Sequence, residues 1–416
     1  MAGVQTAFDG KGGTLIKAAI AKGMTHRNTS FPGHCNRPEG EEQRERKFAK
    51  PQAQSREEKA VAKIWQAGQK KETEAEKTAR VAHNTQMLSL PYTAKVAVAE
   101  SRIRDWQTTC EQYGKNYAVS VGGLDSITLL ALCREVLGHC DGISVSILED
   151  KSIQSVHKEM GVIPIKPLKS KVQVLREYGY PIVSKQASAK ISRLQTSGDT
   201  SPIIKAYMTG EEGAWGKHKT NLRFKLPDKW VKLFGGLYGE FRPDLNCQVA
   251  PFKVSDQCCY WLKEEPARRY QEEHNIWPFL GLMQSEGGRR QYSLRMHGCN
   301  YVGKDTARSC PFNFFSRQDL LQLALDLHVH VPEIYGEIVR DADGTLRTTK
   351  AQRTGCSMCG YGIHLDKRPH HFDLLYQRNP DEWRFWMYDQ GWGEVLDYIG
   401  VGWRPEDLPG AQNGQA

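Results

Sequence analysis

The stretch from Tyr117 to Leu130, YAVSVGGLDSITLL, constrains the fold most. A short apolar run breaks at Gly122 and Gly123, and a second apolar run starts almost at once, which predicts a strand, a glycine turn and the start of a helix. Paired glycines let the backbone approach a phosphate, and the free N–H groups of the helix start bind the anion. The stretch therefore predicts a phosphate-binding loop; a plain structural turn is the alternative reading.

The residues around this stretch predict a βαβ unit. Expected are a helix over 94–113, a helix from Ser126 to Leu137, a strand over 143–148, a short extended piece at 162–165 and a helix over 172–178. Strand, helix and strand at this spacing favour a parallel sheet with ligands at the carboxyl ends of its strands. Glu149 and Asp150 would then lie near the loop, where they could accept from a ribose hydroxyl or hold Mg²⁺. Capping of the next helix is the alternative.

Composition divides the 416 residues into four parts. We expect a flexible, charged and partly helical leader over 1–90, a nucleotide-binding α/β core over 91–250, a cysteine-rich part over 251–405 and a flexible tail over 406–416. No segment approaches the roughly 18 consecutive apolar residues of a membrane span. The sequence therefore predicts a cytoplasmic protein with no membrane partner.

The formal net charge of +9 favours polyanionic partners such as nucleotides or nucleic acid. A solvated surface of mixed charge is the alternative. Lys185, Arg289 and Arg290 are candidates to neutralise a phosphate or sulfate, because arginine donates in pairs to an oxyanion. Each of the three could instead be an ordinary surface charge.

The eleven cysteines are informative through their spacing. Cys258 and Cys259 are adjacent, and Cys356 and Cys359 form a C-x-x-C pair, whose two thiolates can chelate a soft metal centre. Cys299 lies between the two pairs, and Cys310 is a weaker candidate. With no export signal, a structural zinc or an iron–sulfur centre is favoured over disulfides. Ordinary buried cysteines are the alternative.

The glycine loop resembles the pyrophosphate loop S-G-G-x-D-S of the adenine-nucleotide alpha hydrolase superfamily. Gly122, Gly123, Asp125 and Ser126 match that pattern, whereas Val121 stands in place of its leading serine and Ser120 comes one residue early. The order of this loop, CCYWLKEEP, GLMQSEGGRRQ and RTGCSMCGYGIH is similar to the phosphoadenosine phosphosulfate (PAPS) reductase family, in particular its phage and prophage members. The resemblance covers about residues 93 to 403 and implies a parallel-sheet, Rossmann-like α/β core with a cysteine-rich C-terminal portion.

Carried over to this sequence, the resemblance implies an enzyme with a nucleotide site and a metal site. Asp125 and Ser126 would be catalytic. The nucleotide, either ATP or a sulfonucleotide (PAPS or adenylyl sulfate, APS), would meet Ser120, Gly122, Gly123, Asp125, Ser126, Glu149, Asp150, Lys185, Arg289 and Arg290. Cys258, Cys259, Cys356 and Cys359 would hold a 4Fe–4S cluster, with Cys299 as an alternative ligand and zinc as an alternative metal.

The expected reaction is sulfur-related and has two forms. Sulfonucleotide reduction is one, and it would need a thiol reductant protein. No cysteine follows Cys359, so the tail thiol of the familiar reductases has no counterpart, which favours the second form: adenylation with ATP followed by sulfur transfer. That form would need a sulfur donor and an acceptor, for which a nucleic acid is plausible. A nucleotide- or nucleic-acid-binding protein on a degenerate enzyme scaffold is the alternative.

Overall fold

A computed structural model describes residues 73–211, 224–303 and 306–408. Contacts divide the chain into two units, Met1–Gln69 and Lys70–Ala416. Most of the predicted leader lies outside the described residues, and so does the predicted tail from residue 409 onward. Within the leader, α3 (Glu74–Leu88) is a described helix that begins with a capping box from Thr73 and Glu76. The limits proposed inside the second unit, at 250 and 405, stay predictions.

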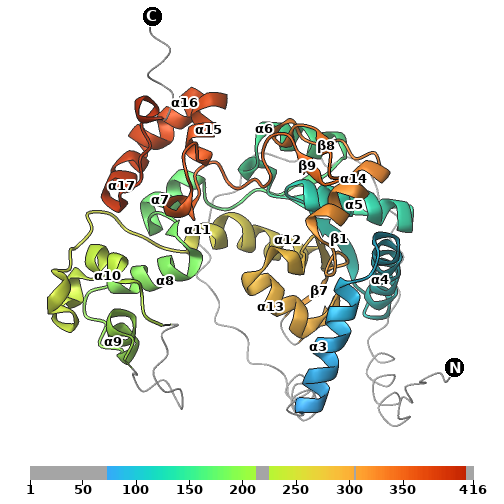
Figure 1. The fold of residues 1–416 in the computed structure, drawn as a ribbon, viewed down its shortest axis with the longest axis horizontal. Coiled ribbons are helices and arrows are strands. Elements are labelled where there is room, and N and C mark those ends of the chain that lie inside the picture. Colours follow the sequence, from blue (N-terminus) through green and yellow to red (C-terminus); the bar gives the residue numbers. More distant parts are fainter. Residues whose placement is uncertain (1–72, 212–223, 304–305, 409–416) are drawn as a thin grey trace, which may run out of the picture. The chain divides into compact units, whose positions relative to one another are not determined.

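A six-stranded sheet forms the centre of the second unit (Figure 1). Its strand order is β3-β2-β1-β5-β7-β6, and all neighbouring pairs are parallel except β6 and β7. This mainly parallel sheet confirms the α/β class predicted from the βαβ pattern. The strands are β1 (Asn116–Ser120), β2 (Asp141–Ser144), β3 (Ile163–Pro164), β5 (Ile276–Leu280), β6 (Asn300–Val302) and β7 (Ala307–Ser309).

The strand order reverses at β1. From β1 the chain moves outward through β2 to β3 on one side, whereas β5 and β7 lie on the other side. Such a reversal opens a crevice at the carboxyl ends of the two central strands, where open parallel sheets bind their ligands. The glycine loop follows β1 and Gly281 follows β5, so both border this point.

One apolar core packs around the sheet. It joins helices α4 and α5 to the strands through fully buried side chains such as Ile103, Trp106, Ile127 and Phe279. A helix that lies against a sheet is apolar round much of its surface, as α5 is. The helices of this part are α4 (Tyr92–Gln112), α5 (Leu124–Leu137), α6 (Lys151–Glu159), α12 (Glu265–Glu273), α13 (Gly288–His297) and α14 (Arg317–Asp326).

A second apolar core is mainly helical and rich in tryptophan, with Trp230, Trp383, Trp386, Trp392 and Trp403 all buried. Figure 1 shows its helices in green, yellow and red. They are α7 (Lys171–Tyr178), α8 (Lys185–Leu194), α9 (Pro202–Thr209), α10 (Asp228–Phe234), α11 (Gln257–Cys259), α15 (His371–Arg378), α16 (Pro380–Arg384) and α17 (Trp392–Ile399). No helix among the described residues is long and apolar enough to cross a membrane.

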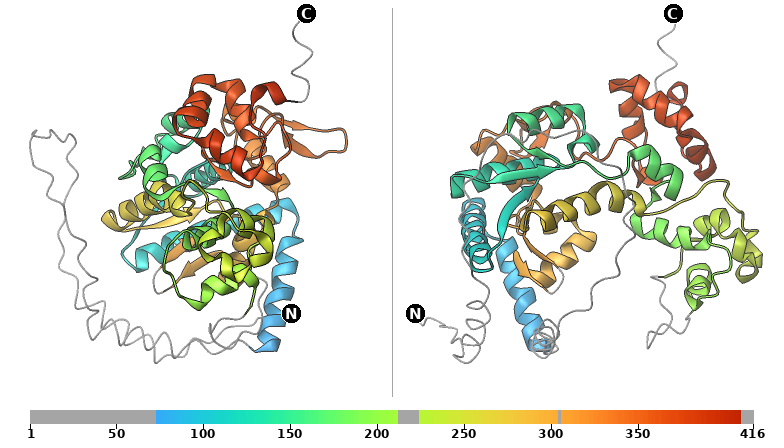
Figure 2. Two further views of the ribbon diagram at one scale, coloured as in Figure 1. Left: turned by 90° about the vertical axis from the view of Figure 1, so that its left-hand side faces the viewer. Right: turned by 180° about the vertical axis from the view of Figure 1, so that it is seen from behind.

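Short elements connect the two cores. The rear view in Figure 2 shows α11 and α12 in one continuous yellow stretch, which includes the π-helical turn η4 (Tyr260–Glu264). The other short elements are β4 (Ile182–Val183) parallel to β10 (Gly360–Tyr361), the hairpin of β8 (Ile338–Arg340) and β9 (Leu346–Thr348), and a second π-helical turn η8 (Phe385–Asp389). Single 3₁₀ turns are η1 (Ser146–Leu148), η3 (Pro243–Leu245), η5 (Gln284–Glu286), η6 (Glu333–Tyr335), η7 (Ile363–Leu365) and η9 (Pro405–Asp407), and η2 (Gly236–Phe241) is a longer 3₁₀ segment with a kink at Tyr238.

The second predicted strand is shorter than expected. The prediction of a strand over 143–148 is wrong after Ser144, because β2 ends there and a 3₁₀ turn, η1, follows. Ser144 pairs with Pro164 of β3, and proline has no N–H with which to continue the ladder. Leu148 turns instead into the helical core. The chain thereby places Glu149 close to the loop after β1.

Candidate functional site

The glycine loop lies where the sequence predicts it. β1 ends at Ser120, Gly123 caps the helix, and α5 begins at Leu124, two residues earlier than expected. Ser126 closes the loop on itself: its hydroxyl accepts from the N–H of Gly122 at 2.7 Å and donates to the carbonyl of Gly123 at 3.0 Å. Ser120 lies one turn of chain earlier, and its hydroxyl accepts from Gln271 at 3.5 Å.

His157 supports the loop from α6. Its Nε2 lies 2.8 Å from the carbonyl oxygen of Gly122, which can only accept, so Nε2 carries the hydrogen. Its Nδ1 lies 2.9 Å from the hydroxyl of Ser146. Burial lowers the pKa of His157, against the opposing effects of the Gly122 hydrogen bond and of Glu149. The neutral form of the ring is therefore favoured, and it supports the loop through its hydrogen bond to Gly122.

At Gly123 and Gly281 other atoms come so close to the backbone that a side chain would not fit. A Cβ on Gly123 would stand 2.3 Å from the hydroxyl of Tyr335 and 3.3 Å from Oγ1 of Thr354. A Cβ on Gly281, after β5, would stand 3.1 Å from the backbone of Ser126. The start of α5 is therefore enclosed on two sides by segments far away in the sequence.

Charged side chains surround the first turn of α5. Asp125 pairs with Arg317 of α14 at 2.5 Å, and Arg317 also donates to the carbonyl of Gln352 at 3.0 Å. Burial raises the pKa of Asp125, Arg317 opposes this, and Glu286 adds to it. Arg353 stands 4.0 Å from Glu286. The arginines that face the loop are therefore Arg317 and Arg353, neither of which was predicted as a nucleotide ligand.

The two predicted carboxylates have different surroundings. Glu149 lies beside Gly122, whose added Cβ would stand 3.7 Å from Oε1, and its carboxylate pairs with Lys263 of η4 at 3.3 Å. Asp150 caps α6: it accepts from the N–H and the hydroxyl of Ser152 at 3.0 and 2.7 Å, and pairs with Arg378 at 2.9 Å. Glu149 is thus available to the loop, whereas Asp150 takes the capping role left open by the sequence.

Two of the three predicted basic residues, Lys185 and Arg290, form ion pairs with carboxylates. Lys185, at the start of α8, pairs with Glu264 and faces Cys259. Arg290 pairs with Glu286 on the loop side of α13. Arg289 also lies on α13, but its side chain is outside the described residues.

Four of the five predicted cysteine ligands lie close together. Cys258 and Cys259 belong to α11, and Cys356 and Cys359 form a turn before β10 in which Cys359 donates its N–H to the carbonyl of Cys356 at 3.0 Å. Burial raises the pKa of Cys258, and neighbouring Cys356, Cys259 and Cys359 raise it further. Burial raises the pKa of Cys359 to about 12; Cys356 and Cys259 add to this effect, and a hydrogen bond with the Tyr361 backbone opposes it. We refer to Cys258, Cys259, Cys356 and Cys359 as the thiol group.

Cys299 is not part of the thiol group. It precedes β6 at the edge of the sheet, where Asn313 donates to its sulfur at 3.6 Å and its backbone carbonyl accepts from Cys310 at 2.8 Å. The structure therefore separates it from the other four candidates, for a topological reason: its segment belongs to the sheet, whereas the four cysteines lie on α11 and before β10.

The thiol group has features that suit a metal centre without forming a finished one. Over residues 73–211, 224–303 and 306–408, no group of three or more His, Cys, Asp or Glu side chains is arranged to hold a metal ion. The buried hydroxyl of Tyr361 has no hydrogen-bond partner among the described residues, and the charges of Cys259, Cys359 and Cys258 raise its pKa after burial. Thiolates or sulfides of a bound centre would accept from this hydroxyl.

Lysines bring positive charge to the thiol group. The ammonium of Lys263 interacts with Cys356 as well as with Glu149, and these interactions raise the pKa of Lys263 against the effect of burial. Lys171 of α7 donates to the hydroxyl of Ser357, inside the C-x-x-C turn, at 3.1 Å. A cation beside a thiol lowers its pKa. Lys263 does so for Cys258, Cys259 and Cys359, but burial has the larger effect and the pKa of all three stays raised.

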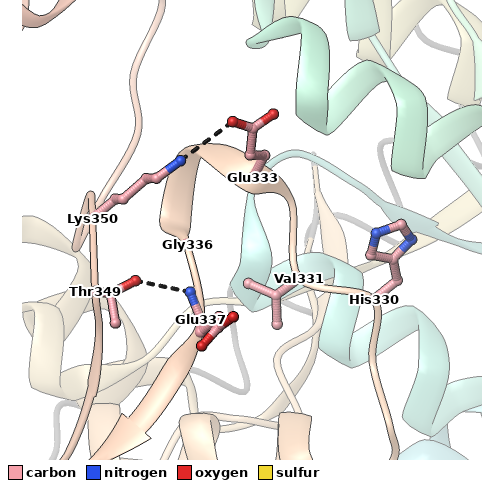
Figure 3. Close-up of a pocket in the computed structure, with 7 residues that line it drawn as sticks. All are labelled: His330, Val331, Glu333, Gly336, Glu337, Thr349 and Lys350. Carbon is pink, nitrogen blue, oxygen red and sulfur yellow. Dashed lines mark hydrogen bonds and ion pairs between the residues drawn. The ribbon is translucent and has the colours of Figure 1, made fainter.

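A hollow of about 440 Å³ lies apart from both features. Figure 3 shows it beside η6, with an ion pair between Lys350 and Glu333 at 3.3 Å. None of the predicted site residues is among those that line it: His330, Val331, Glu333, Gly336, Glu337, Thr349 and Lys350.

Three of the residues that hold the loop were missed at the sequence level: His157, Arg317 and Tyr335. Arg317 is 192 positions from Asp125, and Tyr335 is 211 positions from Leu124. No local pattern in one sequence marks such partners. For His157 a signal existed, since the residue lies on the expected crossover after the second strand.

Comparisons with known proteins add little to this geometry. No protein-family model matches the chain, and no curated protein matches it. Among solved structures, a phosphoadenylyl-sulfate (PAPS) reductase from Candida auris, in a phosphate complex, is similar over 64% of this chain and 95% of that chain, with 12% identity and a TM-score of 0.32. The α/β assignment therefore rests on the strand order and the loop.

Proposed function

We propose that the chain is an enzyme that binds an adenine nucleotide at the loop from Gly122 to Ser126 and performs sulfur chemistry at the thiol group. One observation carries the proposal: Lys263 joins Glu149, beside the loop, to Cys356 of the thiol group. A loop built to receive an anion and a set of thiols are thus neighbours through a single side chain. This arrangement suits a reaction in which sulfur meets a phosphate or sulfate group.

The chain's own residues would hold the nucleotide as follows. N–H groups at the start of α5 face the pyrophosphate, and Arg317 and Arg353 neutralise its charge. Asp125 orients Arg317, and Glu149 can accept from a ribose hydroxyl or hold Mg²⁺. The catalytic roles of Asp125 and Ser126 stay predictions. Two contacts support placing them at the nucleotide: Ser126 fixes the loop, and Asp125 pairs with Arg317.

The metal site is also a proposal. The thiol group would supply the ligands of a 4Fe–4S cluster or of zinc, after its side chains draw together. Such a centre supplies electron-transfer or Lewis-acid chemistry to a nearby sulfur atom. Lys263 would balance the negative charge of the ligands, and Tyr361 would donate a hydrogen bond toward them.

Two forms of the reaction are compatible with this site. In the first, PAPS or APS is reduced, sulfite leaves, and the two electrons come from a thiol reductant that ends as a disulfide. In the second, an acceptor oxygen attacks the α-phosphorus of ATP, pyrophosphate leaves, and a sulfur donor then displaces AMP. A nucleic acid is the acceptor that a basic chain would favour, and the cytoplasm is the compartment in which thiols stay reduced.

Product analysis tests the proposal. Protein purified without oxygen, with its iron, sulfide and zinc content recorded, is incubated with ATP and Mg²⁺ and, separately, with PAPS or APS and a dithiol. Release of pyrophosphate supports the adenylating form, and release of sulfite supports the reducing form. The absence of both products from folded, nucleotide-binding protein would contradict the enzyme.

The second candidate is a nucleotide-binding protein without turnover. The observation that favours it is the Tyr335 hydroxyl, which takes the N–H of Leu124 that a phosphate would use. Asp125→Ala separates the two functions. An enzyme loses turnover with its fold intact, whereas a binding protein changes only in ligand affinity.

A further inference from the structure

The hydroxyl of Tyr335 contacts the first turn of α5, next to the glycine loop. It accepts from the N–H of Leu124, the first residue of α5, at 3.1 Å, and it shares a 2.8 Å hydrogen bond with Oγ1 of Thr354. The first N–H groups of a helix have no partner within the helix and are the donors that bind anions. The tyrosine therefore uses a donor that the pyrophosphate of a bound nucleotide would need.

The backbone around Tyr335 holds the segment that leads to the thiol group. The carbonyl of Tyr335 accepts from the N–H of Lys350 at 3.0 Å, and that of Ile334 accepts from Ala351 at 3.1 Å. Figure 3 shows this turn, with the Lys350 side chain extended toward Glu333. Residues 350–354, which we call the connecting segment, are thus bound to η6 at one end and to the tyrosine hydroxyl at the other.

A second contact binds the connecting segment to the loop. Arg317 joins the carboxylate of Asp125 to the carbonyl of Gln352. Cys356 follows Thr354 by two residues, so the connecting segment leads directly to the first cysteine of the C-x-x-C turn. Any change of the Tyr335 contact is therefore transmitted over a very short stretch of chain.

We infer that Tyr335 is a positioning residue that couples occupation of the loop to the placement of Cys356. This inference rests on the proposed function, because it takes the loop as the nucleotide site. An anionic oxygen is a stronger acceptor for the Leu124 N–H than a neutral phenol is. A bound pyrophosphate therefore displaces the hydroxyl, the contact with Thr354 is weakened, and the connecting segment gains freedom to bring Cys356 to the nucleotide.

Hydrogen exchange on the full chain tests the coupling, with inorganic pyrophosphate and ATP, each with Mg²⁺, as probes. Peptides over residues 118–128 report occupation of the loop, and peptides over 346–355 report the connecting segment. We expect either probe to slow exchange in the first region and to speed it in the second. In Tyr335→Phe, exchange of the second region is fast without a probe and no longer responds.

Affinity provides the second readout. Removal of the competing hydroxyl leaves the Leu124 N–H free, so Tyr335→Phe binds pyrophosphate about 3- to 10-fold more tightly, the effect of one neutral hydrogen bond. Thr354→Val, which keeps the Tyr335 contact to the loop, speeds exchange of the connecting segment and changes affinity less. Tyr292→Phe is the matched control, because Tyr292 is an exposed tyrosine of α13.

The outcomes separate the inference from the proposed function. If neither probe protects the loop, both fail. If the loop is protected but the connecting segment does not respond, or if Tyr335→Phe weakens binding, the nucleotide site stands and the coupling through Tyr335 is wrong. Thermal unfolding of each variant shows whether the fold is retained.

Discussion

The ammonium of Lys263 lies 3.3 Å from the carboxylate of Glu149, and it also interacts with the side chain of Cys356. Glu149 is nearly buried, with 9% of its side chain exposed, whereas 43% of the Lys263 side chain is exposed. The lysine therefore compensates a carboxylate that has little access to water. Lys263 thus interacts both with Glu149, beside the loop after β1, and with the cysteines of α11 and of the turn before β10.

Lys263→Met should lower stability and weaken nucleotide binding together. Loss of the partner leaves the Glu149 carboxylate buried without compensation, and we expect about 1 kcal/mol of lost unfolding free energy, a value reduced for the partial exposure of the lysine. Urea unfolding and ATP titration measure the two effects. Lys185→Met is the control, because the Lys185–Glu264 pair is exposed on both sides. Equal losses in the two variants would contradict the role of Lys263.

The loop and the fold class could be predicted from the sequence because their signals are local. A strand, two glycines and a helix start lie within fourteen residues, and Gly122, Gly123 and Ser126 occupy the expected positions. The same holds for the C-x-x-C turn of Cys356 and Cys359, whose spacing alone places two thiols together.

The partners of these motifs could not be predicted, because they come from distant segments. Nothing near Tyr335 marks it as a contact of Leu124, and Arg317 follows an ordinary helix cap at Ser316. Cys299, which the resemblance gave as an alternative ligand, lies at the sheet edge with Cys310. The positions of Tyr335, Arg317 and Cys299 depend on the topology of the chain, which local sequence patterns do not encode.

Gly123→Ala should destabilise the protein and disturb the loop. The new methyl group would stand 2.3 Å from the Tyr335 hydroxyl, and such overpacking costs about 1 to 3 kcal/mol. The double variant with Tyr335→Phe removes the clashing oxygen, after which the nearest atom is Oγ1 of Thr354 at 3.3 Å, so much of the loss should be recovered. Urea unfolding of the single and double variants measures this coupling.

Gly355→Ala is the control for Gly123→Ala. Gly355 lies one residue after Thr354 and one before Cys356, and a Cβ there meets nothing within 4 Å. We expect a change within about 0.5 kcal/mol, as for most open sites. If Gly123→Ala were equally mild, the close approach of Tyr335 would not exist in solution.

Metal content distinguishes the cysteines. Cys356→Ser and Cys258→Ser should each lose most of the bound iron or zinc, because each removes a thiol of the thiol group. Cys299→Ser should retain it, because Cys299 lies with Asn313 and Cys310. Elemental analysis and the visible spectrum of protein purified without oxygen measure the result. Loss of metal in Cys299→Ser with retention in Cys356→Ser would reverse the assignment.

Chelation tests the same site from the other direction. If the thiol group holds a metal, its removal leaves four thiols side by side, three of them with pKa values raised by burial. Metal binding contributes to folding free energy where the ligands come from separate segments, as α11 and the β10 turn do. We therefore expect a lower unfolding temperature after chelation in the native protein. Unchanged stability would contradict a structural role for the metal.

Stability should fall below neutral pH because of His157. Burial lowers the pKa of this histidine in the folded state, so the unfolded chain binds the proton more readily. Its contribution is therefore fully present above the unfolded pKa of about 6.5 and is lost as pH falls from there through the folded pKa. The second proton would also place a charge under Gly122, where the neutral ring donates from Nε2.

His157→Gln keeps an N–H donor and cannot titrate. Urea unfolding at pH 7.5 and 5.5 should show a smaller difference for this variant than for the native protein, whereas His139→Gln, which removes an exposed histidine, should leave the difference unchanged. An equal pH response in native protein and His157→Gln would place the titrating group elsewhere.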